Sequence, residues 1–227
     1  VPHPPIILPN IGRGEEKKIQ DIADACQHAA DAIVASQPDT ILIVSPHAPS
    51  YFDYIQISDG PSGHGSMAQF RDPMDTFEIP YDRELIRETA RICEETGIPA
   101  GTLGQQDGSL DHGTMVPLYF LEEALKRAPG STKRPQFVRI GIGGPNSRMH
   151  YRVGQAFAQA AETLGKTIAI VGSGDLSHCQ KEDSGYGFKP EGPAYDAMIM
   201  DIMGQADFLK LLEIPEETAE AARGCGQ

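Results

Sequence analysis

The sequence is poor in basic residues. Its 19 lysines and arginines stand against 32 aspartates and glutamates, which gives a formal net charge of −13 at pH 7. Sequence-independent binding to a phosphate backbone depends on lysine and arginine side chains. We therefore expect no nucleic-acid partner.

Paired cysteines and long hydrophobic runs are also missing. Cys26, Cys93, Cys179 and Cys225 are scattered and form no CxxC pair. This spacing is a poor disulfide framework and a poor zinc-finger pattern, and it fits a reducing cytosol. No apolar run approaches the roughly 18–20 residues that span a bilayer, and no signal peptide precedes Val1. We therefore predict a cytoplasmic protein with no membrane partner, and we expect both termini to be truncated.

Short apolar runs alternate with amphipathic stretches along the chain. The runs at 40–44, 137–144 and 167–171 predict buried strands, and the stretches at 15–36, 82–97, 115–125, 146–165 and 192–223 predict helices, the last with a break near Pro215. This alternation predicts one α/β domain over residues 1–227, with a central, mostly parallel or mixed sheet flanked by helices. Ligands of such sheets bind beyond the carboxyl ends of the strands.

Two histidines lie in matching Pro-His-x-Pro frames. His3 occurs in "VPHPPI", and His47 occurs in "SPHAPS", just after the strand expected at 40–44. Proline fixes its own φ angle and biases the preceding residue toward an extended backbone. The frames therefore predict two imidazoles on stiff, non-helical mounts.

Five other histidines have different surroundings. His28 and His150 lie on polar helix faces, so we expect them to be surface residues, and His64 lies in a glycine-rich loop, where we expect no functional role. His112, in "LDHGT", is expected in a turn, and His178 ends the loop "GSGDLSH", directly after a predicted strand. Loops beyond strand ends carry function disproportionately, so His112 and His178 join His3 and His47 as candidate site residues.

Several neutral imidazoles in one place favour a divalent-metal site. Two histidines and a carboxylate with open positions suit non-haem Fe(II), which must bind both substrate and dioxygen. The same ligands can hold Zn²⁺ and activate water for hydrolysis. The residue types alone leave both metals open.

Other chemical motifs are weak or missing. "GIGGPN" (141–146) lacks the GxGxxG spacing of a dinucleotide-binding loop, and no GxSxG elbow is present. Ser173, in "GSGDLSH", is therefore expected to belong to a small-residue bend rather than to act as a nucleophile.

Four motifs together resemble a known family. "VPHPPIILP", "SPHAP", "LDHGTMVPLYFL" and "SGDLSH" occur in this order over nearly the whole chain. In this combination the chain resembles the class III (LigB-type) extradiol ring-cleavage dioxygenases, and within them the Memo-like branch.

The resemblance implies a non-haem Fe(II) site and assigns roles to four histidines. His3 and His47 match the two histidine ligands of the family. His178 matches its catalytic acid/base histidine, and His112 matches a second catalytic histidine that lines the pocket. Each role requires an imidazole that is neutral or can change its protonation near pH 7.

The third ligand of that family is a glutamate near the C-terminus, which a cysteine replaces in some Memo-like members. Cys225 aligns with that position, and Glu220 is the nearest carboxylate. A thiolate ligand favours Zn²⁺ or copper over oxygenase iron, so these metals remain alternatives to Fe(II).

The function implied is Fe(II)-dependent extradiol cleavage of a small catechol-type aromatic diol with O₂. An alternative is a Memo-like metal-binding protein without dioxygenase activity, with a redox or peptide-binding role. A zinc hydrolase is a third hypothesis. The sequence does not determine whether the protein forms a homo-oligomer.

Overall fold

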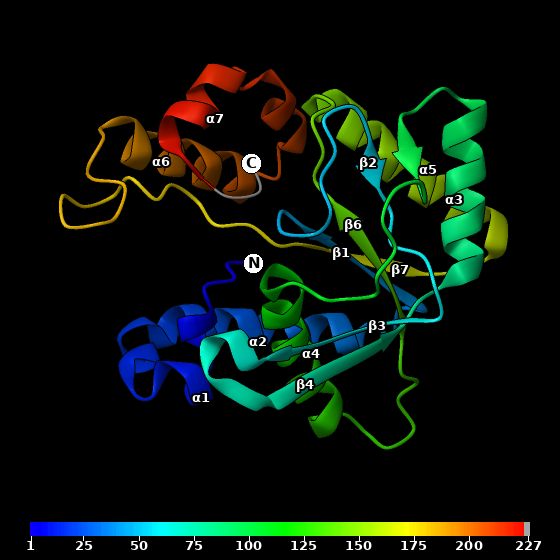
Figure 1. The fold of residues 1–227 in the computed structure, drawn as a ribbon, viewed down its shortest axis with the longest axis horizontal. Helices are drawn as coiled ribbons and strands as arrows, with labels where there is room; N and C mark the ends of the chain where they lie inside the picture. Colours follow the sequence, from blue (N-terminus) through cyan, green and yellow to red (C-terminus); the bar gives the residue numbers. More distant parts are fainter. Residues whose placement is uncertain (225–227) are drawn as a thin grey trace. The chain divides into compact units, whose positions relative to one another are not determined.

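Three of the apolar runs form a parallel sheet in the computed structural model, which describes residues 1–224 (Figure 1). The strands are β1 (Thr40–Ser45), β6 (Gln136–Gly141) and β7 (Ile168–Gly172), in the order β6-β1-β7. Thr40 pairs with Gln136 on one side and with Ile168 on the other. Because both pairings are parallel, the three carboxyl ends lie at one edge of the sheet.

The two outer strands differ in burial. β6 is buried from Phe137 to Gly141, whereas β7 pairs with β1 alone among the described strands and leaves Ile170 58% exposed. The prediction of a strand at 167–171 is confirmed, but the prediction that it is buried is wrong. An apolar run indicates a strand without revealing that the strand lies at a sheet edge.

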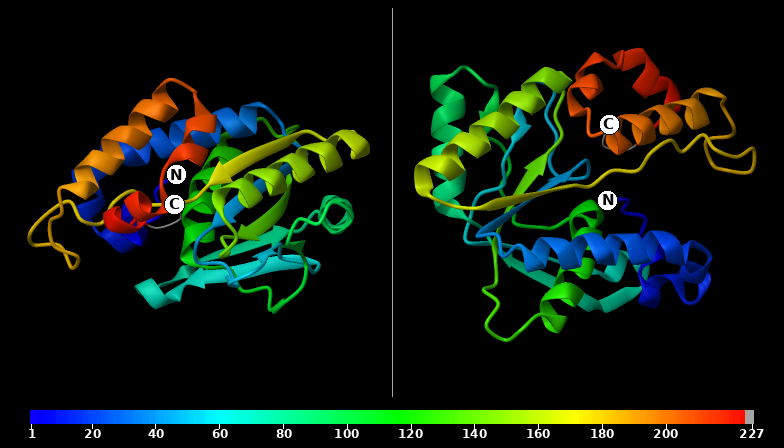
Figure 2. Two further views of the ribbon diagram at one scale, coloured as in Figure 1. Left: turned by 90° about the horizontal axis from the view of Figure 1, so that it is seen from above. Right: turned by 180° about the vertical axis from the view of Figure 1, so that it is seen from behind.

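Helices cover the sheet in two packed pairs. α2 (Gln20–Ala35) packs on α4 (His112–Arg127), and α3 (Arg83–Glu95) packs on α5 (Ser147–Leu164). The right-hand view of Figure 2 shows α3 and α5 on one side of β1 and β7, and α2 on the other. The predicted α/β class, with a parallel sheet flanked by helices, is confirmed.

The remaining elements of this part are short. They are the 3-10 helices η1 (Pro5–Ile7), η2 (Glu15–Ile19) and η3 (Ala68–Phe70), the helix α1 (Pro9–Gly12), the parallel pair β2 (Ile55–Gln56) and β5 (Ala100–Gly101), and the antiparallel hairpin β3 (Ser62–Met67) and β4 (Asp72–Pro80). The predicted helix over 15–36 therefore begins as a 3-10 turn and becomes an α-helix only at Gln20.

The chain divides into two compact units. The first comprises Val1 and His3–Ser173 and contains the sheet, and the second comprises Pro2 and Gly174–Gln227. The described part of the second unit holds α6 (Glu191–Gly204), η4 (Phe208–Glu213) and α7 (Glu216–Ala222), with the predicted break at Pro215. Among residues 1–224, no helix is long and apolar enough to cross a bilayer.

Asp82 anchors the start of α3 to the sheet. Its side chain is the N-cap of the helix and accepts the backbone N–H of Leu85, and it also accepts the hydroxyl of Thr40 at 2.5 Å and the ammonium of Lys166 at 2.8 Å. Burial alone raises the pKa of Asp82, but the hydrogen bonds from Lys166 and Thr40 outweigh it and hold the pKa below its usual value.

We expect Asp82→Ala to lower the free energy of unfolding by about 3–5 kcal/mol at pH 7, because it removes the buried carboxylate that pairs with Lys166 and leaves Lys166 only the exposed Glu84. Since the folded pKa of Asp82 is lowered, its contribution is complete above the unfolded pKa of about 3.9 and is lost as the pH falls through the folded pKa. Urea titrations at pH 7 and pH 3 measure both effects. Asn146→Ala removes an exposed N-cap and is the control, with an expected cost of about 1 kcal/mol. A loss at Asp82 no larger than the loss at Asn146 would contradict this account.

Candidate metal centre

His47 follows the carboxyl end of β1. Its backbone N–H donates to the side-chain oxygen of Ser45, the last residue of the strand, at 3.3 Å. The following turn is flanked by Pro46 and Pro49, which restrict the backbone. The exposed imidazole of His47 is therefore carried by a stiff turn at the sheet edge where ligands of α/β folds bind.

His3 reaches the same edge from the N-terminal segment. The amino group of Val1 donates to the carbonyl oxygen of Gly172, at the carboxyl end of β7, at 2.7 Å. The 3-10 helix η1 begins at Pro5, so His3 lies between the anchored amino terminus and this helix. The side chain of His3 is buried, with 1% of its surface exposed.

His112 is the first residue of α4. Asp111 caps this helix by accepting the backbone N–H of Thr114 at 3.0 Å and its hydroxyl at 2.9 Å. The expectation that His112 lies in a turn is wrong: Asp111 has the extended backbone of an N-cap, and the helix starts directly after it. The ring of Phe70 packs edge-on against His112, with centroids 5.4 Å apart.

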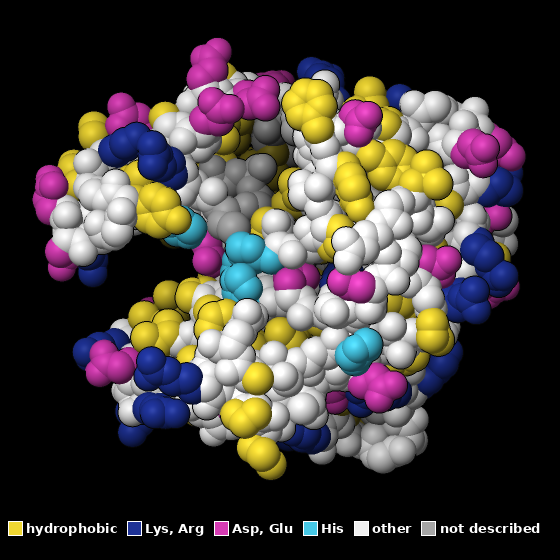
Figure 3. All heavy atoms as spheres, viewed as in Figure 1, with side chains coloured by type: hydrophobic (Ala, Val, Ile, Leu, Met, Phe, Trp, Pro, Cys, Tyr) yellow, Lys and Arg dark blue, Asp and Glu magenta, His cyan; other side chains and the backbone are white. Residues whose placement is uncertain are grey.

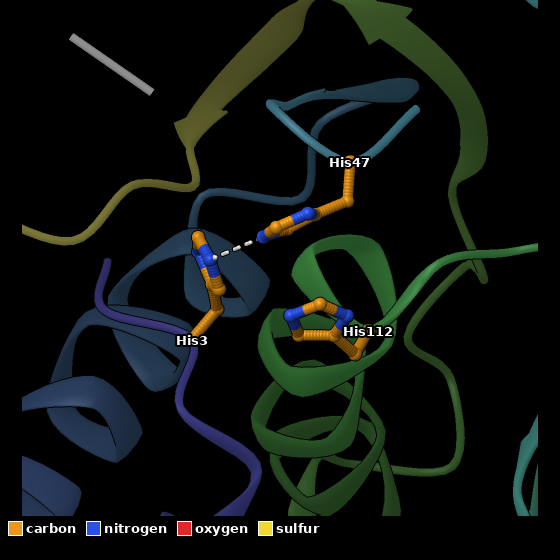
Figure 4. A group of neighbouring side chains, drawn as sticks. All are labelled: His3, His47 and His112. Carbon is orange, nitrogen blue, oxygen red and sulfur yellow. Dashed lines mark hydrogen bonds between the residues drawn. The ribbon is translucent and has the colours of Figure 1, made fainter. Parts of the chain in front are cut away.

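The imidazoles of His3, His47 and His112 converge (Figure 4). Nε2 of His3 lies 3.1 Å from Nε2 of His47, and the ring centroids of His47 and His112 lie 4.0 Å apart. One nitrogen from each ring can be chosen so that all three lie within 4.8 Å of one another, the one such group of potential metal ligands in the described chain. Histidine side chains also lie next to one another at the surface in the space-filling view (Figure 3).

The donor set fits a divalent transition metal. Imidazole nitrogen suits Fe(II), Zn²⁺ and copper, whereas Mg²⁺ and Ca²⁺ prefer oxygen ligands. Metal–nitrogen bonds are about 2.0–2.1 Å long, so two nitrogens 3.1 Å apart can both reach one ion. The geometry also makes His112 a candidate third ligand, a role that the sequence analysis did not give it.

Asp111 joins the two segments that carry His47 and His112. The hydroxyl of Ser45 donates to Asp111 Oδ1 at 2.5 Å, and the same hydroxyl oxygen accepts the backbone N–H of His47. A Cβ atom at Gly113 would lie 2.5 Å from Ser45 Oγ and 3.2 Å from the ring of His47. Glycine at 113 therefore permits the close approach of the two segments.

A buried arginine lies behind Asp111. Arg139, on β6, is 2% exposed; its Nε donates to the hydroxyl of Ser58 at 2.7 Å, and its Nη1 donates to the carbonyl oxygen of Ser109. The same Nη1 lies 3.8 Å from Asp111 Oδ2. The guanidinium thus holds the loop that leads into α4 and places a positive charge beside its N-cap.

The other predicted site residues belong to the second unit or lie outside the described residues. His178 Nε2 is 3.8 Å from Asp175 Oδ2, and the ring of Tyr186 lies 5.1 Å from the ring of His178. Glu220 lies in α7. Cys225 falls outside the described residues. The catalytic role of His178 and the choice between Cys225 and Glu220 therefore stay predictions.

Sequence reasoning missed the residues that hold the histidines in place. Ser173 contacts the imidazole of His3, and Ser45 contacts the backbone of His47 and the Asp111 cap. Arg139 lies beside the same cap, and none of the three was singled out as part of a site. Arg139 carried a usable signal, because an arginine inside an apolar strand requires buried polar partners.

Comparison with known proteins identifies the family of this chain. The family model described as "Catalytic LigB subunit of aromatic ring-opening dioxygenase" matches residues 1–227. Protein CA_C1420 of Clostridium acetobutylicum is 32% identical over all of this chain and 48% of its own length. The 2,3-dihydroxyphenylpropionate/2,3-dihydroxicinnamic acid 1,2-dioxygenase of Mycolicibacterium vanbaalenii is 26% identical over 78% of this chain and 54% of its own. The protein of the same name from Klebsiella pneumoniae is 26% identical over 72% of the chain and 51% of its own.

The chain spans about half the length of these curated relatives. The family match covers every motif in which the converging histidines occur, and it covers the sheet edge that carries them. With its α/β fold and its histidine cluster, the chain belongs to the LigB family of aromatic ring-opening dioxygenases, a family of oxidoreductases.

Proposed function

We propose that this protein is a non-haem Fe(II)-dependent extradiol dioxygenase that cleaves a small catechol-type diol with O₂. The observation that carries the proposal is the convergence of His3, His47 and His112 at the carboxyl edge of the sheet, in a chain of the LigB family. Relatives named as 2,3-dihydroxyphenylpropionate dioxygenases support a substrate with two adjacent ring hydroxyls.

His3 and His47 would hold the ion through their Nε2 atoms, which lie 3.1 Å apart. Bound Fe(II) supplies the chemistry with dioxygen that no amino-acid side chain provides. His112 lies against His47 and donates or accepts a hydrogen bond at the substrate, and the edge-on ring of Phe70 limits its rotation. The third ligand is Cys225 or Glu220, with His112 as the further candidate that the geometry adds.

His178 is the acid/base residue of this proposal. It accepts a proton from a ring hydroxyl and returns it later in the reaction. Asp175, with Oδ2 3.8 Å from His178 Nε2, forms an ion pair with the imidazolium once His178 is protonated. Tyr186 packs on the same ring and restricts its orientation.

The test is anaerobic reconstitution with one equivalent of Fe(II), followed by oxygen and a panel of catechols that includes 2,3-dihydroxyphenylpropionate. We expect oxygen uptake matched by a coloured ring-fission product, and we expect His178→Ala to lower turnover by about 100-fold or more while iron remains bound. Iron binding without oxygen uptake from any catechol would reject the proposal and favour the Memo-like alternative, a metal-binding protein without dioxygenase activity. Ester or amide hydrolysis by the Zn²⁺-loaded protein, abolished in His47→Ala, would favour the zinc hydrolase.

A further inference from the structure

Ser173 follows the carboxyl end of β7 and is only 3% exposed. Its backbone N–H donates to the carbonyl oxygen of Val44 at 2.9 Å, which extends the pairing of β7 with β1 by one residue. The sheet therefore fixes the position of the Ser173 hydroxyl beside the converging histidines.

This hydroxyl has two partners from different parts of the chain. It donates to the carbonyl oxygen of Gly113, in the first turn of α4, at 2.6 Å, and its oxygen lies 3.0 Å from Nδ1 of His3. A carbonyl oxygen can only accept, and a hydroxyl has a single proton to donate. With that proton directed to Gly113, the contact with His3 is a hydrogen bond only when His3 Nδ1 is the donor.

We infer that Ser173 is a positioning residue that holds His3 as the Nδ1–H tautomer. A neutral imidazole carries its proton on one nitrogen and a lone pair on the other, so Nε2 of His3 is left as the ligand atom. Nε2 is the atom that faces His47 at 3.1 Å (Figure 4). The metal-binding part of this inference rests on the proposed function, whereas the tautomer does not.

The arrangement also orients the ring. Ser173 joins β7, the first turn of α4 and the N-terminal segment, and the last two of these carry His112 and His3. A metal ligand whose second nitrogen donates a hydrogen bond has a fixed tautomer and ring orientation, and loss of such a partner weakens metal binding by about 10–100-fold. Ser173 thus fixes the tautomer and the ring orientation that His3 needs as a metal ligand before any ion binds.

Nuclear magnetic resonance of the metal-free protein tests the tautomer directly. Long-range ¹H–¹⁵N correlation spectra of histidine-labelled protein at pH 8, where imidazoles are mostly neutral, separate the two tautomers. His3→Gln assigns the His3 signals. We expect Nδ1–H for His3 in the wild-type protein, loss of this preference in Ser173→Ala, and its retention in Ser173→Thr, which keeps the hydroxyl.

Titration with Fe(II) under nitrogen then measures the consequence. We expect Ser173→Ala to bind about 10–100-fold more weakly than the wild-type protein. Thr40→Val is the control: it removes another buried hydroxyl, bonded to Asp82 at the opposite end of β1, and should leave Fe(II) affinity unchanged.

An Nε2–H form of His3 in the wild-type spectrum would overturn the inference, and this result needs no variant to fold. An unchanged tautomer in Ser173→Ala would also overturn it, even with weaker Fe(II) binding, because the serine would then act only through packing. The predicted tautomers together with Fe(II) binding but no oxygen uptake would leave the role of Ser173 supported and reject the ring-cleavage proposal alone.

Discussion

His47→Ala is expected to lower the affinity for Fe(II) by more than about 100-fold and to reduce ring cleavage to background. The reason is direct: the substitution removes one of two Nε2 atoms that lie 3.1 Å apart, and loss of a ligand costs more than the 10–100-fold lost with an outer hydrogen-bond partner. Iron binding by equilibrium titration under nitrogen and oxygen uptake with a catechol measure the two effects.

The control for His47→Ala is His28→Ala, which removes an exposed imidazole from α2 and should change neither quantity. His112→Ala adds a second comparison. Retained iron with lost turnover supports the pocket-lining role of His112, and loss of iron identifies it as a ligand. Wild-type iron affinity in His47→Ala would contradict the proposed site.

Arg139→Met is expected to lower the free energy of unfolding by about 3–5 kcal/mol, because it leaves the partly buried Asp111 carboxylate without the guanidinium beside it. The Ser109 carbonyl and the Ser58 hydroxyl lose a donor at the same time. Urea denaturation of the metal-free protein gives the value directly.

Arg134→Met is the matched control for this change. Arg134 pairs with Glu122 on the surface, where its side chain is 50% exposed, so its loss should cost only about 0–1 kcal/mol. Equal losses in the two variants would show that Arg139 is no more important than a surface arginine.

Local signals explain why much of the fold could be predicted from the sequence. β1 is a continuous apolar run, and Asp82 and Asn146 cap helices whose residues follow them directly in the chain. Gly165 ends α5 in the left-handed conformation that glycine adopts without strain. The exposure of Ile170 could not be predicted from local sequence, because it depends on which strand lies at the edge of the sheet.

The part of the site built on the two Pro-His-x-Pro frames was predictable from the sequence. His3 and His47 were expected together, and their nitrogens lie 3.1 Å apart. The position of His112 was misjudged because an aspartate before a glycine-containing stretch suits both a turn and a helix N-cap. Ser173 was missed because its partner His3 lies 170 positions away, and no local pattern records such a contact.

The most direct test of the metal centre is anomalous diffraction at the iron absorption edge from crystals soaked with Fe(II) under nitrogen. The proposal predicts one strong anomalous peak within bonding distance of Nε2 of both His3 and His47, about 2.0–2.2 Å from each. The same density identifies the third ligand among His112, Glu220 and Cys225. A peak elsewhere, or none between the two nitrogens in crystals that have taken up iron, would contradict the account.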